Sequence, residues 1–209
     1  MKGLFIVFEG GEFVGKTTQM RRLFEQLFRY APVFTGEPWR AVTREGLSRG
    51  MLNAKDELAL VLEDRRAHVQ NVICPALKRG DIVMCERFSG STFANYSVGR
   101  GIGVEEVRAG DLAARCGVQP DLVILLDADP VIVSERAAYA GDHAYFYAKG
   151  LEFHVRVRHS LLAQAYNNFQ WRIINAERDR NAVFNDISAY FANILPPNPY
   201  ALIFSEMKR

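Results

Sequence analysis

The chain has 209 residues, which is enough for one α/β domain with a sizeable core. Its formal net charge is +2, so neither a nucleic-acid polymer nor a membrane surface is required as a partner, and no apolar run approaches the length of a membrane span. The three cysteines, Cys74, Cys85 and Cys116, lack metal-binding spacing, which argues against a zinc site or a disulfide framework and fits a cytoplasmic location.

The first predicted elements are a strand, a glycine-rich loop and a helix. Residues 4–8 are an apolar run typical of a buried parallel strand, and apolar side chains recur with helical spacing from Met20 to Phe28. Between them, residues 10–17 read G-x-x-x-x-G-K-T. A chance match on a glycine-rich turn is the alternative, but in this context the pattern is the phosphate-binding P-loop.

The P-loop predicts contacts to the phosphates of ATP. The residues expected to make them are Gly10, Gly11, Glu12, Phe13, Val14, Gly15, Lys16, Thr17 and Thr18. Lys16 would reach the β- and γ-phosphates, and the Thr17 hydroxyl would hold Mg²⁺.

Short apolar runs alternate with helical patterns along the rest of the chain. We predict further strands at residues 32–35, 81–86, 121–127 and 171–175, and helices at 55–79, 104–116, 151–167 and 179–195. This alternation indicates an α/β fold: a five-stranded parallel sheet with helices on both faces and ligands at the carboxyl ends of the strands. We expect a single domain over residues 1–209, with a short lid at about 139–150 that excludes water over ATP and a Pro-rich tail at about 196–209.

Charged residues follow two of the predicted strands. Arg87 is suited to binding a second phosphate, and Glu86 could orient Arg87 or hold Mg²⁺ through water. The alternative is that Glu86 and Arg87 form an ordinary surface ion pair. Asp127 could lie in the second shell around Mg²⁺, or cap a helix together with Asp129-Pro130.

Arg65 lies in phase with the apolar stripe of the 55–79 helix. A charge on a core face needs a polar partner, because an unpaired buried charge is very costly. A substrate would be such a partner, and a buried acid is the alternative. Arg100, in a glycine-rich turn, could reach a ligand or be a plain loop arginine.

Several motifs occur in an order that resembles the thymidylate kinases (dTMP kinases), which are P-loop nucleoside-monophosphate kinases. The matching segments are Phe8 to Gln19, Asp64-Arg65-Arg66-Ala67-His68, Pro75-Ala76-Leu77, Glu86-Arg87-Phe88, Ser91-Thr92, Gly99-Arg100-Gly101, Pro120-Asp121-Leu122 and Phe153 with Val157-Arg158. The resemblance implies the three-layer P-loop NTPase fold, ATP-dependent phosphorylation of dTMP to dTDP in dTTP biosynthesis, Mg²⁺, and a homodimer.

The resemblance also implies roles for single residues. Catalytic roles fall to Lys16, Glu12, Arg87 and Arg136, and Mg²⁺ binding falls to Thr17 and Glu86. For the substrate, the resemblance places Glu37, Pro38 and Arg87 at the phosphate of the acceptor monophosphate. It places Arg65, Ser91 and Thr92 at the base, and Asn95 and Tyr96 near the sugar. Because phosphoryl transfer depends on positioning and charge neutralisation, no protein nucleophile is expected.

The chain departs from the family pattern in several places. Gly36 replaces an arginine at the acceptor phosphate, for which Arg40 or Arg44 could substitute; Phe13 replaces a P-loop glycine; Val61 and Asn95 replace aromatic residues at the base and sugar. His143 stands at the position where the family has its lid arginine. The basic residues nearby are Arg136, Lys149, Arg156 and Arg158. Two alternatives therefore stay open: a related kinase with another acceptor, such as dUMP, another deoxynucleotide or a nucleoside, and a catalytically weak nucleotide-binding protein.

Overall fold

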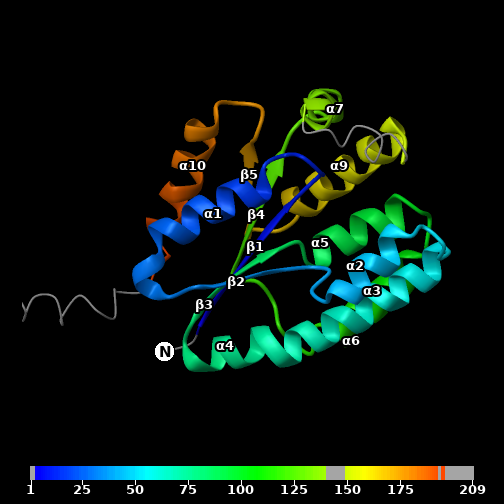
Figure 1. Ribbon diagram of the computed structural model, residues 1–209, viewed down its shortest axis with the longest axis horizontal. Helices are drawn as coiled ribbons and strands as arrows, with labels where there is room; N and C mark the ends of the chain where they lie inside the picture. The colour runs from blue at the N-terminus through cyan, green and yellow to red at the C-terminus, as the bar shows by residue number, and fades with distance from the viewer. Residues whose placement is uncertain (1–2, 140–148, 193, 196–209) are drawn as a thin grey trace, which may run out of the picture.

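The computed structural model describes residues 3–139, 149–192 and 194–195, and its centre is a sheet of parallel strands (Figure 1). The strand order is β2-β3-β1-β4-β5. The strands are β1 (Leu4–Gly10), β2 (Val33–Gly36), β3 (Ile82–Glu86), β4 (Leu122–Asp127) and β5 (Trp171–Asn175). The predicted five-stranded parallel sheet is confirmed.

Helices surround the sheet. They are α1 (Lys16–Gln26), α2 (Ala41–Ser48), α3 (Ala54–His68), α4 (Cys74–Arg79), α5 (Ser89–Thr92), α6 (Val104–Ala114), α7 (Pro130–Tyr139), α9 (Leu151–Tyr166) and α10 (Arg180–Ala192), with a 3₁₀ turn η1 (Phe28–Tyr30) and π-helical turns η2 (Val69–Ile73) and η3 (Phe93–Val98). The predicted helices at 104–116, 151–167 and 179–195 are confirmed as α6, α9 and α10. Helices α2 and α5 were not predicted, because α5 has four residues and α2 buries only Thr43, so neither carries a readable apolar stripe. A helix capped at Asp129-Pro130 was one of the alternatives for Asp127, and α7 begins there at Pro130.

The predicted helix at 55–79 corresponds to α3, η2 and α4 in succession. Asn53 caps its start, since its side-chain oxygen accepts hydrogen bonds from the backbone N–H groups of Lys55 and Asp56. Gly80, with φ of 90°, ends it in the left-handed conformation, as the sequence predicted. The π-helical turn ends two residues before Pro75, whose ring and missing N–H are incompatible with an uninterrupted α-helix.

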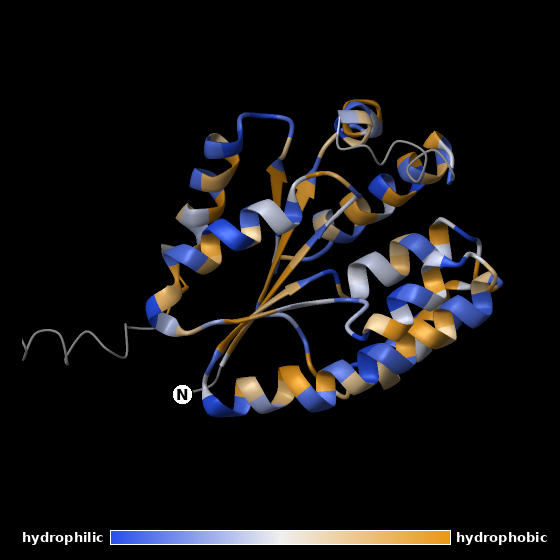
Figure 2. Cartoon of the chain, viewed as in Figure 1, coloured by the Kyte–Doolittle hydropathy of each residue, from blue (hydrophilic) through white to orange (hydrophobic). Residues whose placement is uncertain are grey.

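The core has two layers because side chains alternate across the sheet. Ile6 and Phe8 of β1 face α1, α7 and α10, whereas Phe5 and Val7 face η2 and α4 on the opposite side. The strands are accordingly apolar on both faces (Figure 2). Together with the sheet, these two helical layers give the three-layer arrangement expected from the sequence.

The sheet brings the chemically interesting residues to one edge. Glu86 ends β3 and pairs in register with Phe8 of β1 and Gly36 of β2, so the P-loop and the Glu37-Pro38 turn follow neighbouring strand ends. The predicted tail lies outside the described residues, as does the predicted lid apart from Tyr139, Lys149 and Gly150. In the described part of the chain, no helix combines the length and the apolar character needed to cross a membrane.

Candidate active site

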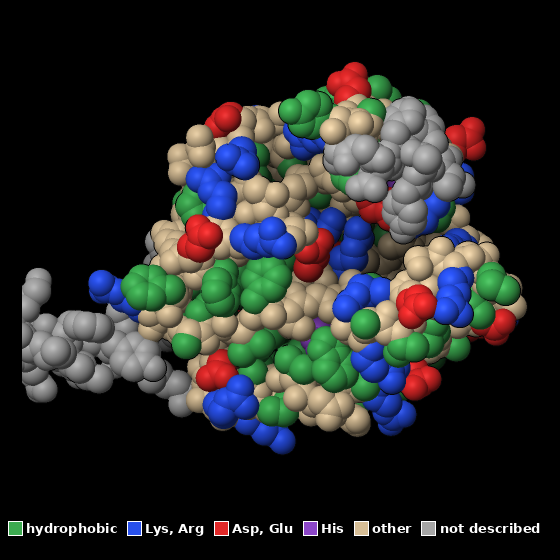
Figure 3. Space-filling model, in the orientation of Figure 1, with side chains coloured by type: hydrophobic (Ala, Val, Ile, Leu, Met, Phe, Trp, Pro, Cys, Tyr) green, Lys and Arg blue, Asp and Glu red, His purple; other side chains and the backbone are tan. Residues whose placement is uncertain are grey.

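A cleft of about 860 Å³ lies over the carboxyl edge of the sheet. In the space-filling view the molecule is hollowed here, and Lys and Arg side chains gather around the hollow (Figure 3). Every residue predicted for the site lines this cleft except Gly10, Gly11 and Val14: Glu12, Phe13, Gly15, Lys16, Thr17, Thr18, Glu37, Pro38, Arg65, Glu86, Arg87, Ser91, Thr92, Asn95, Tyr96 and Arg136. The structure therefore brings together residues from widely separated parts of the sequence.

The P-loop turns from β1 into α1 through unusual backbone conformations. Gly10 has φ of 142°, and a Cβ there would meet the carbonyl oxygen of Leu126 at 2.5 Å, so only glycine fits. Gly15 has φ of 96°. Phe13, which replaces a glycine of the family pattern, also adopts a positive φ of 56°, so this bulky residue keeps a left-handed backbone that is costly for a side chain with a Cβ.

Lys16 is buried at the start of α1, with 4% of its side chain exposed. Its Nζ donates a hydrogen bond to the carbonyl oxygen of Gly11 at 2.5 Å, and the nearest carboxylate oxygen, on Glu86, is 3.9 Å away. Burial, with the neighbouring charge of Arg87, lowers the pKa of Lys16 to about 7. The ammonium group is thus poorly balanced by the protein alone, and an anion in the P-loop would stabilise it.

Thr17 and Glu86 form an oxygen-rich pair beside Lys16. The Thr17 hydroxyl donates a hydrogen bond to Oε2 of Glu86 at 2.7 Å. Hydroxyl and carboxylate oxygens are ligands that Mg²⁺ accepts, and Mg²⁺ usually takes the rest of its shell from water and phosphates. Thr17 and Glu86 supply two such oxygens beside the P-loop lysine, so the donor set fits an ion that is also bound to phosphates.

Arg87 follows β3 with a positive φ of 65° and extends toward the P-loop. Its Nη1 lies 3.4 Å from the carbonyl oxygen of Gly10 and 3.3 Å from Oγ of Ser91. Ser91 is itself held by Glu9, which accepts hydrogen bonds from the Ser91 hydroxyl at 2.5 Å and from the backbone N–H groups of Phe88 and Ser91 at 3.0 Å. Burial raises the pKa of Glu9, and these hydrogen bonds oppose the rise.

Glu9 was missed from the sequence. A carboxylate inside the buried strand β1 must have partners, and that requirement is the signal that could have identified it as the residue that orients the segment after β3.

Arg65 is 1% exposed and pairs with acids of the protein, the alternative weighed from the sequence. Its Nε and Nη2 donate to Oε2 of Glu37 at 2.9 and 2.5 Å, and its Nη1 donates to Oδ1 of Asp111 at 2.6 Å. Nη2 also donates to the Thr92 hydroxyl at 2.8 Å. Burial opposes the charged form, but Glu37 and Asp111 outweigh it and raise the pKa of Arg65. Asp111, on α6, was not anticipated.

The arginines considered as replacements beside Glu37 have partners within the protein. Arg40 pairs with Oδ1 of Asp64 at 2.9 Å, and Arg44 donates to the carbonyl oxygens of Pro38 and Trp39 at 2.6 and 2.7 Å. Neither lines the cleft, and the replacement of the arginine at position 36 by one of them stays a prediction.

Asn95 and Tyr96 lie at the far wall of the cleft on η3. The side-chain amide of Asn95 donates to the carbonyl oxygen of Ser91 at 2.7 Å. Arg100 lies 5.4 Å from the centre of the Tyr96 ring and forms an ion pair with Glu57, and both charged residues line the cleft. Glu57 thus holds Arg100 at the wall of the cleft.

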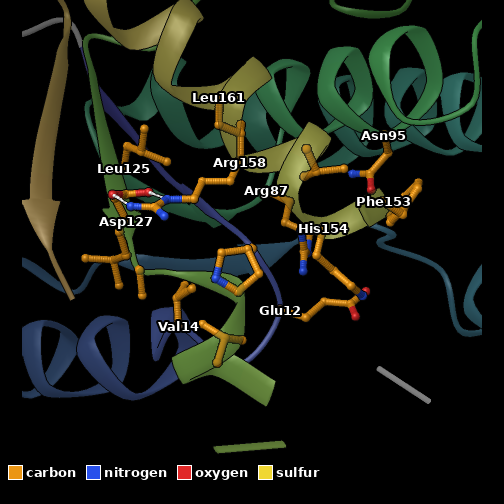
Figure 4. A pocket seen from close by; sticks show the side chains of 16 residues that line it. Glu12, Val14, Arg87, Asn95, Leu125, Asp127, Phe153, His154, Arg158 and Leu161 are labelled. Carbon is orange, nitrogen blue, oxygen red and sulfur yellow. Dashed lines mark hydrogen bonds and ion pairs between the residues drawn. The ribbon is translucent and has the colours of Figure 1, made fainter. Parts of the chain in front are cut away.

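A smaller cavity beside the P-loop is lined by Gly11 and Val14, which do not line the main cleft. Figure 4 shows Val14 in its wall. In its wall, Arg158 of α9 pairs with both carboxylate oxygens of Asp127 at 2.8 and 2.9 Å. The cap of α7 is Asp129, whose Oδ1 accepts from the backbone N–H of Val131 at 2.8 Å. Asp127 is thus not the capping residue, and its carboxylate is bound by arginine.

The comparisons with known proteins agree on one family. The family model described as "Thymidylate kinase" matches residues 8–187. A thymidylate kinase of Pelotomaculum thermopropionicum is 37% identical over 198 residues, which cover 90% of this chain and 92% of that protein. One from Ralstonia nicotianae is 34% identical over 205 residues, covering 93% of this chain and 100% of that protein. The crystal structure of thymidylate kinase from Ehrlichia chaffeensis superposes with a TM-score of 0.74 at 26% identity, covering 92% of this chain and 100% of that chain.

Proposed function

The chain belongs to the thymidylate kinase family and phosphorylates dTMP to dTDP, and we propose that ATP bound to the P-loop is the phosphoryl donor. The observation that carries this proposal is that one cleft joins the P-loop lysine Lys16 to Arg87 and Arg65. Such a cleft offers cationic groups to two phosphate-bearing ligands at once, which is what transfer between two nucleotides requires.

At the donor end, backbone N–H groups of residues 10–18 and the start of α1 would hold the ATP phosphates. Lys16 would exchange its contact with the Gly11 carbonyl for the β- and γ-phosphates, and the exchange would restore a favourable environment to its buried charge. Glu12 would border the sugar and the phosphates, and Arg136, which also lines the cleft, would serve the ATP side.

We propose that Mg²⁺ joins the donor phosphates beside Thr17 and Glu86. Their oxygens lie 2.7 Å apart, which supports a shared role in holding the ion, Glu86 through a bound water. When bound, Mg²⁺ neutralises charge on the β- and γ-phosphates. Thr17 and Glu86 would orient that assembly against Lys16.

At the acceptor end, Arg87 would bind the phosphate of dTMP, with Glu37 and Pro38 bordering it. Among the described residues, Glu37, Asp111 and Thr92 account for four of the five N–H donors of Arg65, which leaves one for a carbonyl oxygen of the base. Ser91 and Thr92 would line the base pocket, and Asn95 and Tyr96 would border the sugar. The acceptor pocket is thus largely preformed by the network around Arg65.

In the reaction, an oxygen of the dTMP phosphate attacks the γ-phosphorus of ATP. The new P–O bond forms as the bond to the β–γ bridging oxygen breaks, and ADP leaves with that electron pair. Lys16 and Arg87 would neutralise the charge and hold the reacting groups in line.

Two broader properties belong to the same proposal. We propose a cytoplasmic protein, which the three free cysteines support, because disulfides are rare in reducing compartments. We also propose a homodimer, as the family resemblance implies; α6 carries the exposed apolar side chains Val104 and Leu112, which support an interface on that side. Light scattering on the purified protein in solution would measure its molecular mass and so test the proposed homodimer.

The test is ADP release with ATP and Mg²⁺ against dTMP, dUMP, ribothymidine monophosphate, dGMP and dCMP, with Lys16→Ala as the control. We expect the highest kcat/KM for dTMP and a dependence on Mg²⁺. A higher kcat/KM for another acceptor would mean that this acceptor, and not dTMP, is the substrate. ATP binding without turnover on every acceptor would indicate a nucleotide-binding protein without kinase activity.

A further inference from the structure

Four basic side chains near the P-loop could supply a second cation to the phosphoryl group in transit. They are Arg136, Lys149, Arg156 and Arg158, and the intervening residues 139–148 contain no Lys or Arg. The structure distinguishes them by their partners and by whether they line the cleft that holds Lys16.

Two of the four do not line the cleft, and a third is anchored to backbone after β5. Arg158 is bound to both oxygens of Asp127 (Figure 4) and, at 3.1 Å, to Asp129. Arg156 is half-exposed, contacts the Gly99 carbonyl at 3.4 Å and does not line the cleft. Arg136 does line it, but its Nη2 donates to the carbonyl oxygen of Ala176 at 2.9 Å, after β5.

Lys149 is the one of the four in contact with a P-loop side chain. Its Nζ lies 2.9 Å from Oε1 of Glu12, four residues before Lys16, and Lys149 lines the same cleft. Nζ also lies 5.7 Å from the centre of the ring of Phe153, a buried residue of α9.

The carboxylate that holds Lys149 is a poor permanent partner once phosphates arrive. Burial alone would raise the pKa of Glu12, but the charges of Lys149 and Arg87 outweigh it and lower that pKa, so Glu12 is anionic. Its second oxygen, Oε2, is buried and has no hydrogen-bond partner in the described structure. Phosphate oxygens bound over the P-loop would repel Glu12 and attract Lys149.

We propose that Lys149 is a catalytic residue whose ammonium group contacts the phosphoryl group during its transfer. The inference rests on the proposed function of the cleft. Lys149 keeps its protons and donates hydrogen bonds to the phosphoryl oxygens, while the dTMP oxygen forms its bond to the γ-phosphorus and ADP departs with the electron pair of the broken bond. Glu12 holds the lysine in position before the nucleotide binds.

The experiment compares Lys149→Ala and Lys149→Arg with the matched control Lys55→Ala. Lys55 is an exposed lysine on α3 that pairs with Glu106 outside the cleft. In Lys149→Ala, kcat should fall by about 10²–10³-fold while the Kd for ATP changes by less than about threefold. Lys149→Arg should recover most of the lost rate, and Lys55→Ala should match the wild type.

A second measurement separates catalysis from a merely structural ion pair. Binding of ADP, dTMP and fluoroaluminate, which together imitate the phosphoryl group in transit, should weaken in Lys149→Ala far more than binding of ADP alone. The same loss should appear in a Glu12→Gln background, where no ion pair remains to be broken.

Several results would overturn the proposal. They are a kcat for Lys149→Ala within about threefold of wild type, no recovery in Lys149→Arg, or no further loss in the Glu12→Gln background. A wild-type protein without dTDP formation would instead refute the proposed function itself, so the two failures are distinguishable.

Discussion

The two ends of the cleft hold buried positive charge in different ways. At the P-loop end, Lys16 is buried with its nearest carboxylate oxygen 3.9 Å away, and burial lowers its pKa to about 7. At the acceptor end, Arg65 is buried to the same degree but is bound by Glu37 and Asp111, which raise its pKa. One cation is therefore balanced by the ligand and the other by the protein.

The difference indicates what each end contributes. A buried lysine whose charge lacks a close carboxylate is stabilised mostly when phosphates bind. Its interaction with those phosphates therefore holds the transferring group. A balanced arginine keeps a rigid pocket in place before the acceptor arrives, so its contribution is preorganisation.

The largest expected effect is on turnover in Lys16→Met. Loss of the P-loop ammonium should lower kcat by about 10³-fold or more, measured as dTDP formation. The free energy of unfolding of this variant should rise. Because the pKa of Lys16 is about 7 in the folded protein and 10.5 ordinarily, the folded state binds fewer protons between these values, and the charged lysine costs stability below about pH 7.

The free energy of unfolding of Lys16→Met, from urea denaturation, should therefore exceed the wild-type value at pH 6 by roughly 1–4 kcal/mol. The excess should shrink as the pH rises through the window toward 10.5. A variant that is less stable than wild type at pH 6 would contradict the underbalanced charge.

The next largest effect is on folding in Arg65→Met. Removing the arginine leaves Glu37 and Asp111 buried without their cation, so the free energy of unfolding should fall by about 3–5 kcal/mol. The control is the triple variant that adds Glu37→Gln and Asp111→Asn, in which most of the loss should be recovered. An unchanged unfolding midpoint in Arg65→Met would mean that the protein does not depend on this network.

The smallest effect is proton uptake on ligand binding. At pH 8, above its pKa of about 7, Lys16 is mostly neutral in the free protein, and ATP phosphates should raise that pKa and draw in up to about one proton per site. At pH 6 the uptake should vanish, because Lys16 is already charged. Titration calorimetry in buffers of different ionisation enthalpy measures it.

Two controls sharpen this measurement. Lys16→Arg should show no uptake at pH 8, because a guanidinium stays charged. Binding of dTMP at pH 8 should draw in no proton through Arg65, whose raised pKa keeps it charged throughout. Equal uptake with both ligands would contradict the contrast between the two ends.

The fold was readable from the sequence where local pattern decides it. Apolar runs predicted all five strands, and the P-loop pattern predicted the loop between β1 and α1. Gly80 predicted the end of α4 because a left-handed residue is a local requirement. The short helices α2 and α5 were not predicted, because few of their positions face the core and their apolar patterns are weak.

The membership of the site was also largely readable, whereas its pairing was not. The sequence by itself predicted that Lys16, Thr17, Glu86 and Arg87 share one cleft, because strand ends of a parallel sheet converge at one edge, and the family resemblance added Arg65. Only the tertiary structure decided that Arg65 meets Asp111, 46 residues away, and that Lys149 meets Glu12, 137 residues away. Secondary structure follows from the period of neighbouring residues, but a charge interacts with whatever carboxylate lies within a few ångströms, and folding of the whole chain sets those distances.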